Sequence, residues 1–234
     1  MADKSDKKPA LRALQKRSVE TRSRIIHAAA EIFDEKGYAA SSISMILDRA
    51  ELTKGALYHH FNTKEQIAEA LLAAQVPMSR ITPQESKWQE AIDTSFAYAR
   101  LLQTHPEARA GVRLSIDGGV PPDLDVYGPT RQWIELVTYL MTQVDAMGHL
   151  SADWTPRSAA ELLQSTFVGA QMTSLQITGP LRSDLHERIE SMWKGLLPGM
   201  ATMSALKKGL DYDADRWNRI HWEDPSAGSA PAES

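Results

Sequence analysis

The chain has 234 residues, which is enough for one large domain or two small domains with a hydrophobic core. It contains no cysteine, which excludes disulfides and thiolate metal sites and fits a reducing cytoplasm. The N-terminus lacks the apolar segment of a secretory signal, and no apolar run is long enough to cross a membrane. We therefore expect a globular, cytoplasmic protein.

Charge is distributed unevenly along the chain, whose formal net charge is −4. Residues 1–80 carry 13 Lys and Arg against 10 Asp and Glu, whereas the remaining residues carry 13 against 20. A basic first third on an acidic body indicates that only the N-terminal end meets a polyanion.

The N-terminal segment predicts a flexible basic arm followed by a helix. Residues 1–17 are charged and lack an apolar stripe, so they are interpreted as the arm. Apolar residues then recur at helical spacing and predict a helix over 20–36, which Gly37 ends; they are Ile25, Ile26, Ala29, Ala30 and Phe33.

Two short helices and a longer one follow. The stretch "SSISMILDRA" predicts a helix capped by Ser41 or Ser42, and Thr53 caps another that ends near Phe61. Thr63 begins the longer helix "KEQIAEALLAAQ", with a Gln three residues later as in a capping box. We assign these helices to a first domain, residues 18–75.

The third helix, within residues 52–61, has two different sides. Leu52, Ala56, Leu57 and Phe61 fall on one side. The other side carries Lys54, Gly55, Tyr58 and His59, with His60 at the border. Helix, tight turn and second helix form a helix-turn-helix, whose second helix can enter a major groove.

Each outward residue of that helix has a chemical use at DNA. A lysine at 54 supplies charge, Gly55 allows close backbone approach, and the aromatic rings reach backbone oxygens or sugars. Lys64 is a further candidate for a phosphate contact. A solvated helix face is the alternative. The case for a metal site is weaker, because the side chains of adjacent His residues on a helix point about 100° apart.

Residues 20 to 72 resemble the DNA-binding domain of tetracycline-repressor-type regulators, through the pattern "FDEKGY" followed by "TKGALYHHFNTKE". The resemblance implies an all-α homodimer that binds double-stranded DNA at a palindromic operator. It also implies roles for eight residues: Thr53, Lys54, Gly55, Tyr58, His59 and His60 at the DNA, and Ser42 and Lys64 on phosphates.

The rest of the chain predicts a second helical domain over residues 76–221, for ligand binding and dimerisation. Helices are expected over 85–104, 106–116, 128–147, 156–177 and 182–203, and a disordered tail over 222–234. The helix over 182–203 is apolar at Leu185, Ile189, Met192, Trp193, Leu196, Leu197 and Met200. That stripe suggests a dimer interface with the helix over 156–177. A plain core helix is the alternative.

Three segments of this domain resemble γ-butyrolactone autoregulator receptors: "ARAGVRLSIDGG", "TRQWIELVTYL" and "LLQSTFVGAQ". The resemblance implies a repressor of antibiotic or hormone genes that a small diffusible signal releases, either a butyrolactone or an alkyl furan carboxylic acid. It also implies that Trp133 lines the ligand cavity.

Other candidate ligand residues come from the apolar stripes. Polar groups within the stripes could orient a carbonyl or carboxylate; they are Tyr98, Gln164, Thr166 and Gln171. Leu114, Leu136, Val137 and Phe167 are the apolar candidates. Each residue could equally belong to the core or to a dimer contact.

Other classes of function find less support. The sequence has no nucleophile elbow, P-loop, Rossmann glycine pattern or zinc-protease motif, so we expect no enzyme, no cofactor and no metal. His105, His149, His186 and His221 are expected at the surface or at helix ends. A repressor of efflux or catabolic genes, a pure interaction protein and, remotely, a small-molecule-processing enzyme remain alternatives.

Overall fold

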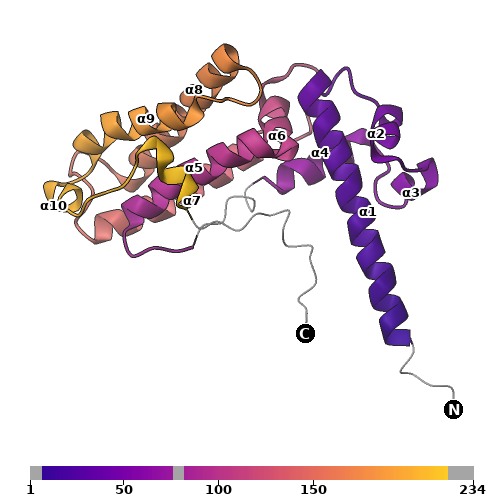
Figure 1. Cartoon of the computed structure of the whole chain (residues 1–234), viewed down its shortest axis with the longest axis horizontal. Coiled ribbons are helices and arrows are strands. Elements are labelled where there is room, and N and C mark those ends of the chain that lie inside the picture. Colours follow the sequence, from indigo (N-terminus) through magenta and orange to yellow (C-terminus); the bar gives the residue numbers. More distant parts are fainter. Residues whose placement is uncertain (1–6, 76–81, 221–234) are drawn as a thin grey trace. The chain divides into compact units, whose positions relative to one another are not determined.

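The computed structural model describes residues 7–75 and 82–220, which form helices and connecting turns (Figure 1). The expected all-α class is confirmed. Over these ranges the β-type pairing is one isolated bridge between Leu150 and Ala201. The helices are α1 (Lys7–Lys36), α2 (Ile43–Ala50), α3 (Lys54–Tyr58), α4 (Lys64–Ala73), α5 (Lys87–Thr104), α6 (Pro106–Ile116), α7 (Gly128–Ala146), α8 (Pro156–Thr178), α9 (Leu185–Met200), α10 (Met203–Leu206) and the 3-10 helix η2 (Ala214–Asn218).

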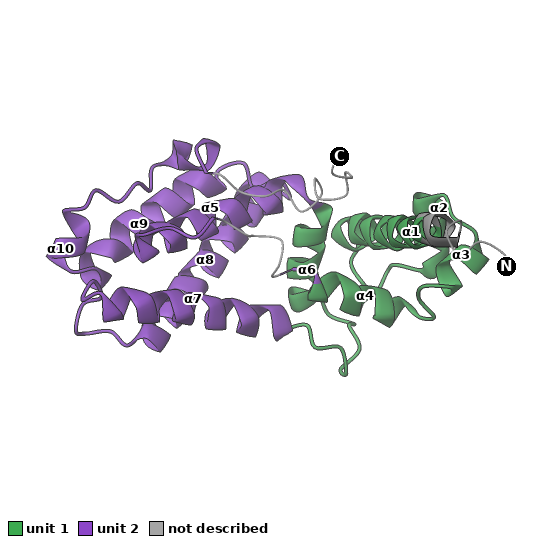
Figure 2. Ribbon diagram, turned by 90° about the horizontal axis from the view of Figure 1, so that it is seen from below, with its two compact units in different colours: residues 1–73, 106–126 green, residues 74–105, 127–234 purple. Residues whose placement is uncertain are grey.

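The helices belong to two compact units (Figure 2). The first contains the residues up to Ala73 together with Pro106–Val126, and the second contains Ala74–His105 and the residues from Tyr127 onward. Helix α6 therefore belongs with the DNA-binding helices, although the sequence suggested a second domain over 76–221. Its buried residues pack into the core of the first unit.

The first helix is longer than expected. The helix expected over 20–36 begins at Lys7, so the expectation of a flexible arm over 1–17 is wrong for residues 7–17. Residues 1–6 lie outside the described ranges. Gly37 does end α1: it has φ +79° and its N–H donates to the Phe33 carbonyl over 2.9 Å. Glycine adopts this left-handed conformation without steric cost.

The first unit has a core to which all five of its helices contribute. Ile25, Phe33, Ile46, Leu57 and Ile67 are fully buried there, and Leu114 of α6 is 1% exposed. Burying such side chains stabilises the unit by roughly 1.5–3 kcal/mol each. This packing holds α3, which is too short to be stable alone.

Polar contacts add to the packing of α6 on α1. Arg109 Nε donates to the Asp34 carboxylate over 2.6 Å, and Arg113 donates to the Asp34 carbonyl. His27 Nδ1 lies 2.6 Å from Glu107 Oε1. The α1–α6 pair is therefore joined by several hydrogen bonds as well as by apolar burial.

The second unit packs α5, α7, α8 and α9 around an apolar core. The α9 stripe turns out to belong to that core: Leu185, Ile189, Met192, Trp193, Leu197 and Met200 are buried, and Leu196 is partly buried. Contacts of α9 with α5 and η2 support the core alternative for the stripe, and a dimer interface on α8 and α9 stays a prediction. Across the described residues, no helix is long and apolar enough to span a membrane.

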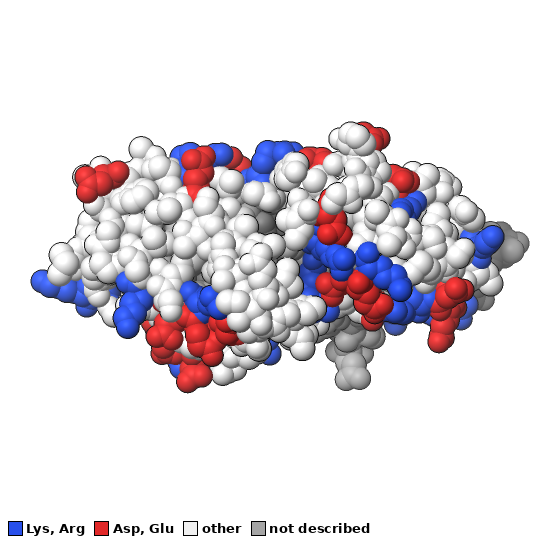
Figure 3. Space-filling model, turned by 90° about the horizontal axis from the view of Figure 1, so that it is seen from above, with Lys and Arg blue, Asp and Glu red and all other residues white. Residues whose placement is uncertain are grey.

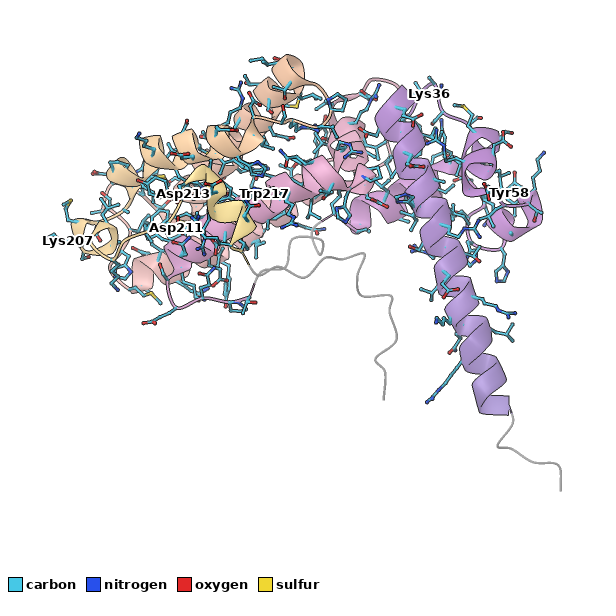
Figure 4. All side chains as sticks on the ribbon, viewed as in Figure 1. Lys36, Tyr58, Lys207, Asp211, Asp213 and Trp217 are labelled. Carbon is cyan, nitrogen blue, oxygen red and sulfur yellow. The ribbon has the colours of Figure 1, made fainter. Side chains whose placement is uncertain are left out.

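A C-terminal strap, residues 207–220, lies on α5 and α9. Arg216 forms two hydrogen bonds with the buried Asp93 carboxylate, at 2.8 and 2.7 Å. Gln89 exchanges two hydrogen bonds with the Asp211 backbone. Figure 4 labels Asp211, Asp213 and Trp217 along this strap. Residue 221 and the tail expected to be disordered, 222–234, lie outside the described residues.

Candidate nucleic-acid interface and small-molecule site

Side-chain caps and one left-handed residue build the turn between α2 and α3. Ser42 accepts a hydrogen bond from Met45 N, and Thr53 accepts one from Ala56 N, each over 3.3 Å. Between them Glu51, with φ +53°, ends α2, and only residues 51–53 separate α2 from α3. Caps of this kind stabilise a helix start by roughly 0.5–2 kcal/mol each. The turn therefore fixes where α3 begins and which side of it faces out.

Helix α3 has the two sides that its sequence predicts. Leu57 and Phe61 are buried in the first unit's core. The outward side is exposed and consists of Thr53, Lys54, Gly55, Tyr58 and His59, with His60 partly buried. Tyr58 is 48% exposed and its position on α3 can be followed in Figure 4. A helix-turn-helix with such an exposed second helix has the geometry that reads a major groove.

Gly55 is not required by packing within the chain. A Cβ atom placed there would meet no heavy atom within 4 Å. Glycine is a poor helix former, costing roughly 1 kcal/mol relative to alanine. Its presence on an exposed helix face therefore suits close approach by an external molecule.

The two adjacent histidines interact with each other rather than forming a chelate. Their rings make an edge-to-face contact with centroids 5.0 Å apart. Burial, followed by the neighbouring His59 and Arg22, lowers the pKa of His60. Among the described residues no group of three or more His, Asp or Glu could hold a metal ion.

Lys64 is engaged inside the first unit. Its Nζ donates to the carbonyls of Tyr38 and Ser41, over 2.8 and 3.0 Å, and lies 3.9 Å from the Tyr38 ring centroid. Burial lowers its pKa. Its phosphate contact stays a prediction, since the ammonium would have to leave these partners; the observed contacts hold the turn that leads into α2.

Several basic residues of the first unit are neutralised by acidic neighbours. Arg49 bonds Glu31 and Glu35 over 3.0–3.1 Å, and Arg113 bonds Asp117 over 3.0 Å. On the face drawn in Figure 3, Lys and Arg side chains lie interspersed with Asp and Glu. The basic excess of the first 80 residues therefore does not spread evenly over the unit.

An aromatic cluster inside the second unit joins three of the candidate ligand residues. The Tyr98 ring lies 5.0 Å from the Trp133 ring and 5.8 Å from the Phe167 ring, centroid to centroid. Burial raises the pKa of Tyr98 to about 12, so its hydroxyl stays protonated. That hydroxyl donates to Gln75 Oε1 over 3.2 Å. Helices α5, α7 and α8 thus meet at these three rings.

Two buried polar atoms of candidate ligand residues have no hydrogen-bond partner among the described residues. They are the indole N–H of Trp133 and the side-chain oxygen of Gln171. Gln171 follows Phe167 by four residues on α8, which places both on one face of that helix. An unsatisfied buried polar group costs roughly 1–3 kcal/mol, so native proteins rarely leave one without a use. The two side chains therefore present one free donor and one free acceptor.

The other candidate ligand residues fit this site less well. Leu136, Val137 and Gln164 are partly buried, whereas Trp133 and Phe167 are buried. The Thr166 hydroxyl donates to the Leu162 carbonyl over 2.8 Å, which satisfies it within α8. Leu114 lies in the core of the first unit, so its role as a ligand residue has no support from its position.

Two residues near the cluster were missed from the sequence. Gln75, which bonds Tyr98, is 2% exposed. Arg182 is also 2% exposed, has φ +47°, and its charge partly offsets the raised pKa of Tyr98. Neither lies in an apolar stripe, so no local pattern singled them out.

Both halves of the chain match described protein families. Residues 25–71 match "Bacterial regulatory proteins, tetR family", and residues 85–202 match "Tetracyclin repressor-like, C-terminal domain". The A-factor receptor protein of Streptomyces griseus is 35% identical over 192 residues, which are 81% of this chain and 67% of that protein. The transcriptional repressor BepR of Brucella suis is 26% identical over 166 residues, 65% of this chain and 79% of BepR.

Solved structures agree. TylP, a tetR regulator from Streptomyces fradiae, has a TM-score of 0.79 and 35% identity, covering 92% of this chain and all of TylP. CprB from Streptomyces coelicolor, solved with its operator sequence, has a TM-score of 0.69 and 30% identity, covering 87% of this chain and 99% of CprB. A γ-butyrolactone receptor described as ArpA-like has a TM-score of 0.67 at 30% identity, covering 86% of this chain and 98% of the receptor. The chain belongs to the tetR family of transcriptional regulators and is related to the A-factor and γ-butyrolactone receptors.

Proposed function

We propose that the protein is a homodimeric repressor that binds a palindromic operator and is released by a small diffusible signal of the γ-butyrolactone type. The observation that supports a bound signal is the pair of buried atoms, Trp133 Nε1 and Gln171 Oε1, that have no hydrogen-bond partner among the described residues; the Trp133 ring contacts that of Tyr98. The control of antibiotic production is inferred from similarity to the A-factor receptor and to a structure titled for control of antibiotic production by bacterial hormones, at 26% identity.

The operator contact is assigned to the outward side of α3. Lys54, Gly55, Tyr58 and His59 are exposed there and are held in place by the Thr53 cap. The relative CprB was solved with its biological operator sequence, which supports DNA as the partner of this surface. Specific contacts to base edges and nonspecific contacts to phosphates would share the same helix.

The dimer is assigned to the exposed faces of α8 and α9. Val168, Ile177 and Leu181 are exposed apolar side chains on or directly after α8. Ser165, Gly169 and Gly195 are also exposed and would allow two helix pairs to approach closely. A palindromic operator requires such a two-fold dimer, with α3 helices about 34–36 Å apart.

A hydroxylated butyrolactone satisfies both free atoms. The lactone carbonyl accepts the Trp133 N–H, and a ligand hydroxyl donates to Gln171 Oε1. Tyr98 and Phe167 supply apolar area for an alkyl chain. A furan carboxylic acid, the signal of the methylenomycin furan receptor, can accept from Trp133, but its ionised form has no donor for Gln171. The lactone is therefore the preferred class and the furan acid is the alternative.

Release follows from differential affinity. The ligand is proposed to bind more tightly to a conformation in which the two α3 helices of the dimer are not spaced to fit the operator. Binding then shifts the population away from the DNA-bound state. An almost complete shift requires about 5.5 kcal/mol of differential affinity. In the chain, α6 of the first unit lies between α5 and α7, which carry Tyr98 and Trp133, so it is covalently joined to the helices of the proposed ligand site.

A gel shift with the purified protein and the DNA upstream of its own gene tests the proposal. Complexes are titrated with butyrolactones and with alkyl furan carboxylic acids. Release by hydroxylated lactones alone supports the assignment, and release by furan acids alone replaces the ligand class. Release by a drug or catabolite instead indicates an efflux or catabolic repressor. Failure to bind any DNA at low salt would contradict the whole proposal.

A further inference from the structure

We propose that the N-terminal turns of α1 form a second DNA contact, on the phosphates that flank the site of α3. The inference rests on the proposed operator binding and extends it to a part of the chain outside the matched DNA-binding domain, which begins at residue 25. We call residues 7–19 the basic extension.

The basic extension has a single sign of charge. Its sequence, "KKPALRALQKRSV", contains five Lys and Arg and no Asp or Glu; the next acid along the chain is Glu20. Arg12, Lys16 and Arg17 are exposed. Among the described residues their one ion pair joins Lys16 to Glu20 at 3.9 Å, with both side chains more than half exposed, so it neutralises little. The basic residues of α2 and α6 described above, by contrast, are paired with carboxylates.

The basic extension gains little from packing within the chain. Of the described side chains from Arg12 to Arg24, none is buried, and the first buried residue of α1 is Ile25. Isolated helices of about 12 residues are marginal in water, so a partner is needed to hold this one. Arg12 and Lys16, four residues apart, lie on one face and present two cations to such a partner.

The position of the extension identifies the partner. Arg22 lies over the Phe61 ring, with its guanidinium carbon 5.1 Å from the centroid, and Phe61 follows the last residue of α3 by three positions. With a rise of about 1.5 Å per residue, Arg12 lies about 15 Å further along α1. That length corresponds to about four base pairs of duplex. A duplex held by α3 therefore has phosphates within reach of the extension.

Other occupants fit less well. A second copy of the extension would bring like charges together, which is unfavourable. A membrane surface requires one apolar face, whereas the exposed Leu14 and Val19 are five residues apart and lie on different sides of the helix. The uniform charge and the proximity to α3 both favour DNA.

The test compares full-length wild type with Arg12→Gln/Lys16→Gln on two operator duplexes, one trimmed to the palindrome and one with ten further base pairs at each end. Affinity is measured by fluorescence anisotropy across a salt series. The matched control is Lys207→Gln/Lys208→Gln, which removes the same charge from exposed positions of the second unit. Helical circular dichroism and ligand-induced release confirm that each variant is folded.

We expect wild type to bind the longer duplex more tightly, with a steeper salt dependence. The slope of log K against log salt should fall by about 0.9 for each phosphate contact that Arg12→Gln/Lys16→Gln removes. On the trimmed duplex, the affinity and salt slope of this variant should equal those of wild type. The control Lys207→Gln/Lys208→Gln should have the wild-type affinity and slope on both duplexes. Equal slopes for Arg12→Gln/Lys16→Gln and wild type on the longer duplex would overturn this inference but not the proposed function. Changed self-association or vesicle binding with an unchanged DNA slope would assign the extension to another partner. Absence of DNA binding by wild type would instead overturn the proposed function.

Discussion

The ring of Tyr98 on α5 contacts the indole of Trp133 on α7, with centroids 5.0 Å apart and planes inclined by 62°. The Trp133 N–H is buried and has no hydrogen-bond partner among the residues that the structure describes. Trp133→Phe keeps an aromatic ring at this position but removes that donor. We expect ligand affinity to fall about tenfold, the loss of roughly 1.4 kcal/mol for one buried hydrogen bond, while operator affinity without ligand is unchanged.

Isothermal titration with the ligand, and anisotropy with the operator, measure the two affinities separately. Trp133→Ala should reduce the ligand response further because it also removes the ring. Parallel losses of ligand and operator affinity in Trp133→Phe would mean that the indole is structural.

Replacing Gln171 should change stability and ligand binding in opposite directions. Its buried side-chain oxygen has no hydrogen-bond partner in the described ranges, whereas methionine of similar length carries no group that needs one. Gln171→Met should therefore raise the free energy of unfolding without ligand by about 1 kcal/mol and abolish most of the ligand-induced gain in Tm. Differential scanning calorimetry with and without the ligand measures both. A loss of stability in the free protein would show that this oxygen is satisfied by water.

The outward side of α3 provides the DNA-binding prediction. Lys54→Ala and Tyr58→Ala remove exposed side chains, so each should abolish specific operator binding at physiological salt and leave helical circular dichroism unchanged. Gly55→Ala should also weaken operator binding, although the new methyl group meets no atom of the chain. Anisotropy with the operator and with a scrambled duplex measures specificity. Wild-type affinity in both Lys54→Ala and Tyr58→Ala would contradict the assignment.

Much of the first unit follows from local sequence. Hydrophobic spacing and short-range caps depend on residues three or four apart, and for this reason Ser42, Thr53 and the two sides of α3 were predictable. The capping box at Thr63 was only partly right: Thr63 does accept from Gln66 N, but the Gln66 side chain bonds Asn62 N.

The start of α1 was missed because the residues before Glu20 have no apolar stripe. Pro9 in the first turn and the run of Ala, Leu, Gln, Lys and Arg are helix signals that do not depend on burial. The neighbours of α6 and α9 could not be predicted either. Spacing shows which face of a helix is apolar but not which helix covers it, so Leu114 was taken as a ligand candidate and the α9 stripe as a dimer interface, with a core helix as its alternative.

The C-terminal strap depends on a pair separated by 123 residues, which no local pattern reveals. Arg216 meets Asp93, whose side chain is 2% exposed. Arg216→Ala should destabilise the protein by about 3 kcal/mol, because a buried carboxylate loses its cation. Arg219→Ala is the matched control: it removes an exposed arginine that pairs with Asp211 and Asp213 and should leave stability nearly unchanged. Chemical denaturation measures both, and equal effects would show that the strap contributes only through its surface charges.

His186 lies at a helix end, as expected, in the first turn of α9, but it is buried rather than at the surface. Its ring stacks on Phe96 with centroids 6.4 Å apart and contacts Trp217 at 4.4 Å, and its Nε2 has no hydrogen-bond partner among the described residues. Burial lowers the pKa of His186; Glu187 partly opposes this effect and Arg100 adds to it. The neutral ring is therefore the form that the folded state prefers.

The sign of the pH effect follows from this lowered pKa. The unfolded chain takes up a proton at His186 near pH 6.5, before the folded chain does, so stability is lost as pH falls from about 6.5 toward the folded-state pKa. The loss is at most about 1.4 kcal/mol per pH unit for one group. His186→Phe keeps the stacking and removes the titration, so its free energy of unfolding should depend less on pH over that range. Urea denaturation between pH 7.5 and 5 measures the difference from wild type, and parallel curves for the two proteins would show that His186 takes up its proton equally in both states.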